Sequence, residues 1–459
     1  MHRIPARTSI PALALTLVIA GAAGCGILDT KTPNIVGADD LDTPAGAATK
    51  RLGAISTFTL AKDGDFNPVA VPGSDDTFND NADGYILTSG ILADEFVNPG
   101  FIPSRTEIDL RLATPVTAGL GEQFQSLHRA RAAAEDAAIS LQTFGVDSLR
   151  DFDTGIPEML SLAGLVYVYL AEGFCSGVPV SRIVNDAIEY GQPLTTAQVF
   201  DTAIVRFNAA LAHPSIAAGD PIHSLASVGL GRALLNQARF AEAAAAVATV
   251  PADFVYETEH ATTPAALHNG VYEAFSNGNF GVFDQEGTNG LPYVSAADIR
   301  VTGDSGLGAD NNTESWFPNK YPSFEASVPT ADYLEAQLII AESELQALTF
   351  DAMTTRLNDL RAGLGLTPLA TPGDLVSATD VLFAERAFWL YATGHRLGDM
   401  RRLIRQYARD PETVFPTGDY YKGGLTYGTG VNLPLPRREG NNPNVPSDPS
   451  LSGCLDRNA

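Results

Sequence analysis

Oxygen-bearing side chains before residue 85 have a spacing that could coordinate a cation. Asn79, Asn81, Asp83 and Gly84 match part of a calcium-binding loop. Such a loop needs a bidentate glutamate at its twelfth position, where this sequence has Gly90. The histidines show no paired spacing, and no pair of thiolates is left to form a zinc site. We therefore expect neither a metal nor a cofactor.

A second cluster consists of Glu385, Arg386, Arg396, Asp399 and Arg402, whose charges lie at helical or near-helical spacing. An acid catalyst would need a carboxyl with a raised pKa, whereas arginines this close lower the pKa of a carboxyl. We therefore predict a structural ion network. The sequence also lacks a G-x-S-x-G nucleophile elbow, a phosphate loop and a dinucleotide fingerprint. These patterns predict a protein that is not an enzyme, although two of its 54 carboxylates could still form a glycosidase pair.

Aromatic and amide side chains near residue 320 suit sugar binding. Trp316, Asn319 and Tyr321 follow a run rich in glycine and asparagine, 303–312, which predicts a long loop. Aromatic faces cover the apolar faces of sugar rings, and amides bind hydroxyl groups. We predict ligand contacts at these three residues. The alternative is that Trp316 and Phe317 anchor the loop in the core.

A second candidate ligand surface lies in the loop-rich stretch 63–84. Asp75, Asp76 and Asn79 carry carboxylate and amide groups that can bind sugar hydroxyls. We predict that these residues join the ligand-binding surface.

The elements that must position these side chains are mostly helices. Apolar residues recur at helical spacing in the following segments: 123–141, 156–174, 195–212, 224–237, 240–247, 331–348, 351–364 and 374–408, the last as one or two helices. Small residues in 230–243 resemble a tetratricopeptide hairpin, in which two helices approach closely. We expect helical repeats at about 121–250 and 330–409, a loop-rich insert at about 251–329 and an irregular C-terminal wrap at 410–459.

The N-terminus is that of an exported lipoprotein. Arg3 and Arg7 precede an apolar run at 10–20, and small residues at 21–24 precede Cys25. We predict a signal peptide at 1–24, lipidation of Cys25 and a tether at 25–46. The alternative is an ordinary secretory leader with a cysteine there by chance. No later stretch reads as long and apolar enough to span a membrane.

The net charge limits the kinds of partner that the protein can bind. The chain has 29 basic and 54 acidic residues, and removing Arg3 and Arg7 with the leader leaves 27 against 54, or −27. A surface this acidic repels nucleic acid and anionic lipid, so membrane association must come from the lipid anchor. In an oxidising compartment Cys175 and Cys454 either form a disulfide or remain separate thiols.

Several segments, in this order along the chain, resemble the SusD/RagB family of outer-membrane lipoproteins. They are the mature start at 25–33, Asp94-Glu95, the helix end at 163–180, the helix at 333–342, the 385–402 segment with Gly394-His395-Arg396-Leu397-Gly398-Asp399, and Leu433-Pro434-Leu435-Pro436.

This resemblance implies a mainly helical single domain over 47–459, with four tetratricopeptide-like hairpins, a loop-rich ligand face and few short strands. It also implies an anchored position on the outer membrane, facing the exterior. There the protein would bind oligosaccharides or similar nutrient polymers, in some members peptides. A SusC-like TonB-dependent transporter would be its partner. A helical protein-binding scaffold without a ligand of its own is the alternative, and a surface glycosidase is another.

Overall fold

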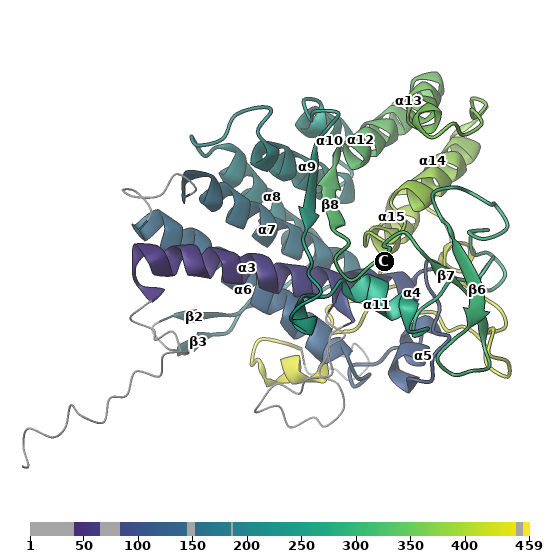
Figure 1. Cartoon of the computed structure of the whole chain (residues 1–459), viewed down its shortest axis with the longest axis horizontal. Coiled ribbons are helices and arrows are strands. Elements are labelled where there is room, and N and C mark those ends of the chain that lie inside the picture. The colour runs from purple at the N-terminus through teal and green to yellow at the C-terminus, as the bar shows by residue number, and fades with distance from the viewer. Residues whose placement is uncertain (1–40, 65–82, 145–151, 185–186, 447–452) are drawn as a thin grey trace, which may run out of the picture.

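The computed structural model describes residues 41–64, 83–144, 152–184, 187–446 and 453–459. Within them the chain is mainly helical, and its few strands form four two-stranded sheets (Figure 1). The predicted fold class is therefore confirmed.

The long helices form two groups along the chain, and within the first group each helix packs on the next. The first group is α3 (Pro44–Asp63), α6 (Leu120–Phe144), α7 (Phe152–Gly173), α8 (Thr196–Leu211), α9 (Pro221–Asn236) and α10 (Phe240–Val247). Helix α10 contacts α12, which begins the second group: α12 (Tyr333–Gln346), α13 (Phe350–Gly363), α14 (Leu375–Trp389) and α15 (Arg396–Tyr407). The 374–408 segment is thus two helices.

Shorter elements complete the molecule. The helices are α4 (Gly84–Leu92), α5 (Pro103–Asp109), η2 (Ala265–Leu267), α11 (Gly270–Ser276), α16 (Pro411–Val414) and η3 (Arg437–Asn441). The paired strands are β1 (Val178–Pro179) with β4 (Pro193–Leu194), β2 (Arg182–Val184) with β3 (Ala187–Glu189), β5 (Val255–Thr258) with β8 (Val328–Asp332), and β6 (Gly303–Leu307) with β7 (Glu314–Pro318).

The starts of α3 and α8 carry side-chain caps. Thr195 Oγ1 accepts a hydrogen bond from the Gln198 amide, and Gln198 Oε1 accepts one from the Thr195 amide, which makes a capping box at α8. Thr43 caps α3 in the same way through Gly46, with Pro44 at the first helical position. Helix α3 therefore begins two residues before the expected end of the tether at 46.

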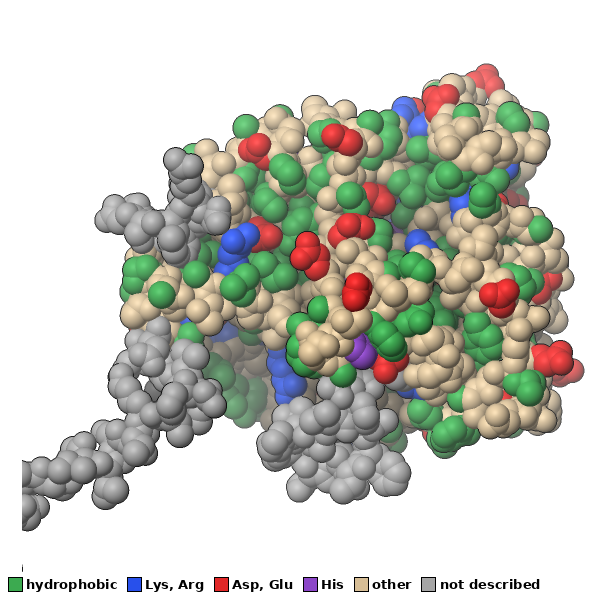
Figure 2. Space-filling view, in the orientation of Figure 1, with side chains coloured by type: hydrophobic (Ala, Val, Ile, Leu, Met, Phe, Trp, Pro, Cys, Tyr) green, Lys and Arg blue, Asp and Glu red, His purple; other side chains and the backbone are tan. Residues whose placement is uncertain are grey.

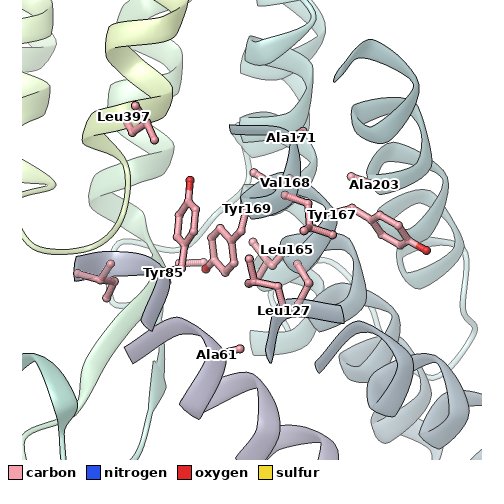
Figure 3. Packing of buried hydrophobic residues seen from close by; sticks show 14 of the residues in the cluster. Ala61, Tyr85, Leu127, Leu165, Tyr167, Val168, Tyr169, Ala171, Ala203 and Leu397 are labelled. Atoms are coloured by element: carbon pink, nitrogen blue, oxygen red, sulfur yellow. The ribbon is translucent and has the colours of Figure 1, made fainter. Parts of the chain in front are cut away.

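Helix α7 is the central helix of the core. Its stretch Thr154–Gly173 has the length and composition of a membrane span, contrary to our expectation, but 83% of that window is buried in the protein. Figure 3 shows Tyr169 on α7 beside Tyr85 on α4, and their rings stack with centroids 4.6 Å apart. Burial between α6, α8 and α9 explains the apolar composition of α7.

The C-terminal segment is fastened to the end of α7. A disulfide joins Cys175 to Cys454, across 279 residues of sequence. The Cys175 amide donates to the Leu433 carbonyl, and the fully buried Arg401 donates to the Ala171 and Glu172 carbonyls. Carbonyls at a helix C-terminus lack partners within the helix, and a guanidinium satisfies several of them at once.

The run 303–312 is not one long loop, as its glycines and asparagines predicted. Its first half is strand β6, which pairs with β7 in register from Gly303 opposite Pro318 to Leu307 opposite Glu314. Gly303 accommodates the close approach of the indole Nε1 of Trp316, because a Cβ at Gly303 would lie 2.7 Å from that atom. These glycines therefore serve a hairpin, which composition alone did not distinguish from a loop.

The predicted ion network is present, but most of its partners come from other elements. Arg386 donates to Asp399 at 2.7 and 2.9 Å, and Arg402 donates to Asp399 at 2.6 Å and to Glu342. Helix spacing accounts for the Asp399–Arg402 pair alone, since Arg396 binds Asp94.

Glu385 belongs to a separate group on the same side of the molecule. It accepts hydrogen bonds from Arg300 and Arg361, which come from the insert and from α13. The charges at 385–402 thus link distant segments instead of stabilising single helices.

A buried pair of carboxyls fastens the tail to α5. Asp109 Oδ2 accepts hydrogen bonds from the hydroxyls of Tyr420 at 2.9 Å and Tyr421 at 2.6 Å, and Glu286 Oε1 accepts one from Tyr427 at 2.9 Å. The other oxygens, Asp109 Oδ1 and Glu286 Oε2, are buried without a donor among the described residues, and the two carboxyls are hydrogen-bonding neighbours. Two carboxylates in such contact cannot both ionise readily.

Burial raises the pKa of Asp109 to about 6. Burial, followed by the charges of Asp109 and the nearby Asp94, raises the pKa of Glu286 well above its usual range. The pair therefore retains a proton at a pH where the unfolded chain has released it. Its contribution to stability is complete below the ordinary values of 3.8 and 4.5 and is lost as pH rises through about 6 and above.

We expect Glu286→Gln to flatten the fall in unfolding free energy above about pH 6. A glutamine amide can donate to Asp109 Oδ1 without titrating, and each retained proton accounts for about 1.4 kcal/mol per pH unit. Urea unfolding across pH measures the difference between variant and parent, with the exposed Asp253→Asn as the control. An unchanged difference at every pH would show that the pair does not share a proton.

Candidate functional site

A cavity of about 400 Å³ opens between α3, β5 and η2. This volume lies in the range of ligand pockets, roughly 300–1,000 Å³. Three walls and one residue of α7 line the cavity. The α3 wall consists of Leu52, Ile55, Ser56, Thr59 and Leu60, and α7 contributes Glu158. The other two walls are Tyr256, Glu257, Glu259 and His260 in and after β5, and Ala266, Leu267 and His268 at η2.

The α3 wall is a single stripe along the helix. Leu52, Ile55, Ser56, Thr59 and Leu60 are three or four residues apart, which places them on one face. The opposite face, with Ala47, Ala54 and Phe58, is buried in the body of the protein. The cavity face thus alternates aliphatic groups with hydroxyls, which suits a ligand with both apolar and hydroxyl surfaces.

The β5 wall follows the two-residue alternation of a strand. Tyr256, Thr258 and His260 point toward the protein and are buried or half-buried, whereas Glu257 and Glu259 are exposed. The strand therefore presents two carboxylates at the edge of the cavity.

Buried charges behind the cavity hold His260 in place. His260 Nε2 lies 3.2 Å from Asp63 Oδ2, and Lys62 Nζ lies 2.7 Å from Asp63 Oδ1. Burial opposes ionisation of Asp63, but the charge of Lys62 and the hydrogen bond of His260 outweigh it and lower the pKa of Asp63. The His260 side chain is 1% exposed, and its Nδ1 has no hydrogen-bond partner in the described part of the chain.

Both carboxylate oxygens of Glu158 already accept hydrogen bonds from other side chains. Arg51 Nε donates to its Oε2 at 2.7 Å, and the Tyr256 hydroxyl donates to its Oε1 at 3.0 Å. These two donors fix the carboxylate as an acceptor that orients Tyr256 at the cavity wall.

The face that bears the cavity is acidic at its centre. Figure 2 shows several acidic side chains and a histidine over the middle of the molecule, where α3 passes the β5–β8 sheet. In the described ranges, no group of three or more His, Cys, Asp or Glu side chains is arranged to hold a metal ion. The cavity lining itself offers hydroxyl, imidazole and carboxylate groups for hydrogen bonding and aliphatic groups for apolar contact.

Comparison with solved structures identifies the fold. A SusD superfamily protein from Bacteroides fragilis aligns over 88% of this chain and 98% of its own, with a TM-score of 0.63 and 14% identity. Surface glycan-binding protein A from Bacteroides uniformis aligns over 90% and 100%, with a TM-score of 0.61 and 13% identity. A SusD-like carbohydrate binding protein from Bacteroides vulgatus aligns over 78% and 83%, with a TM-score of 0.57 and 15% identity. No family model matches the chain, and no curated protein matches it in sequence.

The chain has a SusD-like fold. The resemblance inferred from short sequence segments is therefore confirmed at the level of the fold. At identities of 11–15% the likeness does not transfer individual ligand residues.

The SusD-like fold does not bring the predicted sugar-binding residues to the cavity. Tyr321 is buried, and its hydroxyl donates to the Ala392 carbonyl at 2.8 Å, so it is a core residue. Trp316 is half-buried in β7 and packs against the core, as the alternative interpretation held. Asn319 is exposed and accepts from Thr302, away from the cavity. Cys25, Asp75, Asp76 and Asn79 lie outside the described residues.

The cavity residues went unnoticed in the sequence, although a signal existed. The alternation of Tyr256, Glu257, Thr258, Glu259 and His260 is typical of a strand with one polar face. Neither this pattern nor the stripe on α3 indicates that the two segments meet, since they lie about 200 residues apart.

Proposed function

We propose that this protein binds an oligosaccharide in the cavity between α3, β5 and η2. The observation that carries the proposal is the cavity itself, of ligand size and lined by aliphatic, hydroxyl, imidazole and carboxylate groups. Sugar rings present apolar C–H faces and hydroxyl edges, which match these wall types. Two of the similar structures are named as surface glycan-binding proteins, from Bacteroides uniformis and Bacteroides thetaiotaomicron.

We propose further that the protein captures its ligand without cleaving it. Both oxygens of Glu158 already accept hydrogen bonds, from Arg51 and Tyr256, so the carboxylate is engaged by the protein itself, which is unlike a general acid placed to serve a substrate. Release of shorter products from a bound glycan would favour the glycosidase alternative.

Thr59→Trp tests the cavity by filling it. An indole at this position would occupy space that the ligand needs, so we expect binding to weaken at least about tenfold, or about 1.4 kcal/mol. Isothermal titration calorimetry against a panel of neutral, amine-bearing and acidic oligosaccharides measures the effect.

The matched control is Thr355→Trp on α13. Thr59 and Thr355 each donate a hydrogen bond to the carbonyl four residues earlier in a helix, but Thr355 is exposed and distant from the cavity lining. Equal binding by both variants would refute the cavity as the site. An absence of binding to every glycan would favour the scaffold alternative.

We also propose that the protein is anchored at the outer membrane through lipid on Cys25 and delivers its ligand to a SusC-like TonB-dependent transporter. The leader sequence supports the anchor, and the fold supports the pairing. A chain with several acyl groups at one end remains stably attached to a bilayer.

Cys25→Ala should release the protein from the membrane fraction, because the acidic surface offers no other attraction to lipid. Cell fractionation measures this, and detergent extraction of the tagged parent should recover a TonB-dependent transporter. Membrane retention of the variant would contradict the lipid anchor, and a parent that is extracted alone would contradict the transporter pairing.

A further inference from the structure

We propose that the cavity selects a glycan that carries a free amine, with the ammonium bound between Glu257 and Glu259. This inference rests on the proposed function and names the class of ligand that the same site takes. The evidence for this inference is the charge of the residues that line the cavity.

Negative charge at the cavity is not balanced by its lining. Glu158, Glu257 and Glu259 line it, and no lysine or arginine does so in the part of the chain that the structure describes. Glu158 is neutralised by Arg51, but no described basic side chain forms an ion pair with Glu257 or Glu259. The two exposed carboxylates therefore lie at the cavity without an ion-pair partner among the described residues.

The nearest buried ammonium, Lys62, acts on Glu257 only through its charge at a distance and forms no ion pair with it. Lys62 is 1% exposed and donates to Asp63, Thr258 and the Val328 carbonyl, all behind the wall. A cation at Glu257 and Glu259 must therefore come from outside the described chain.

The alternation of buried and exposed residues, which continues one residue beyond the end of β5 at Thr258, places the two carboxylates on one side. Glu257 and Glu259 are two residues apart and both exposed, whereas Thr258 between them is buried. An ammonium has three donors, which allows it to hydrogen-bond both carboxylates at once.

The remaining walls accommodate the rest of an amino sugar. The α3 stripe combines Leu52 and Ile55 with the hydroxyls of Ser56 and Thr59, for ring faces and hydroxyl groups. His260 also lines the cavity, and its buried Nδ1 has no hydrogen-bond partner among the described residues.

Calorimetric titration of paired oligomers into the mature protein tests the proposal. The oligomers are those of glucosamine and galactosamine, each in free-amine and N-acetylated form, and their affinities are compared. The pH is held mildly acidic, so that the amines carry their positive charge. We expect the free-amine form to bind about 3- to 10-fold more tightly, because exposed ion pairs contribute modestly. Added salt should reduce this preference.

Glu257→Gln/Glu259→Gln should abolish the preference, so that the free-amine and acetylated forms bind this double variant with equal affinity. The control, Glu314→Gln/Glu325→Gln, changes two exposed glutamates outside the cavity lining and makes the same change in net charge. An equal loss in both double variants would overturn the proposal, since the effect would then come from overall charge.

Other outcomes separate this proposal from the function on which it rests. Neutral or acidic glycans that bind better than the amines, and that Thr59→Trp blocks, would overturn the amine preference and leave glycan binding intact. No binding by any glycan would overturn both. Binding of a lysine-bearing peptide in place of the amino sugars, lost in Glu257→Gln/Glu259→Gln, would overturn the sugar class and retain the charge recognition.

Discussion

Arg402, Arg386 and Arg232 are buried where α7, α9, α12, α14 and α15 meet, and each guanidinium there must find a carboxylate. Arg232 donates to Glu172 at 2.5 and 3.0 Å, and Asp399 accepts from both Arg386 and Arg402. An unpaired charge at such depth costs several kcal/mol, so the helices are stable together only in the arrangement that satisfies all of these groups. Burial opposes ionisation of Asp399, but the two arginines hold the pKa of its carboxyl well below its usual range. The network thereby specifies how the helical groups dock.

The positions of the cavity walls depend on this junction of helices. Strand β5 forms one cavity wall and pairs with β8, with Val255 opposite Asp332. Asp332 caps α12 by accepting from the Glu335 amide, and the Glu335 carboxylate lies 3.0 Å from His395 Nε2 in the network. On the other side, α3 packs on α6 and α7. Both walls are thus attached to the array that the buried charges hold, which provides a ligand with a preformed site.

The sequence predicted the parts of this structure that depend on local pattern. Helical periodicity located α6 to α10 and α12 to α15, because the spacing of apolar residues on a helix is a property of neighbours in the chain. Trp316 and Tyr321 were assigned to a ligand surface because aromatic composition does not reveal which face of a hairpin is buried. The cavity escaped prediction for a related reason: Thr59 and Glu257 acquire a common role only after β5 has paired with β8 and come to lie beside α3. Long-range pairing of this kind leaves no signature in either segment alone.

The measurement that tests the account most directly is hydrogen–deuterium exchange of the mature protein with and without the tightest-binding oligosaccharide of the panel. Binding in the cavity should slow exchange in 255–268, where the backbone lies at the ligand, and leave the β6–β7 hairpin and residues 319–321 unchanged. Protection confined to 303–321, with none in 255–268, would place the ligand at Trp316 and Asn319 and contradict the assignment of the cavity as the binding site.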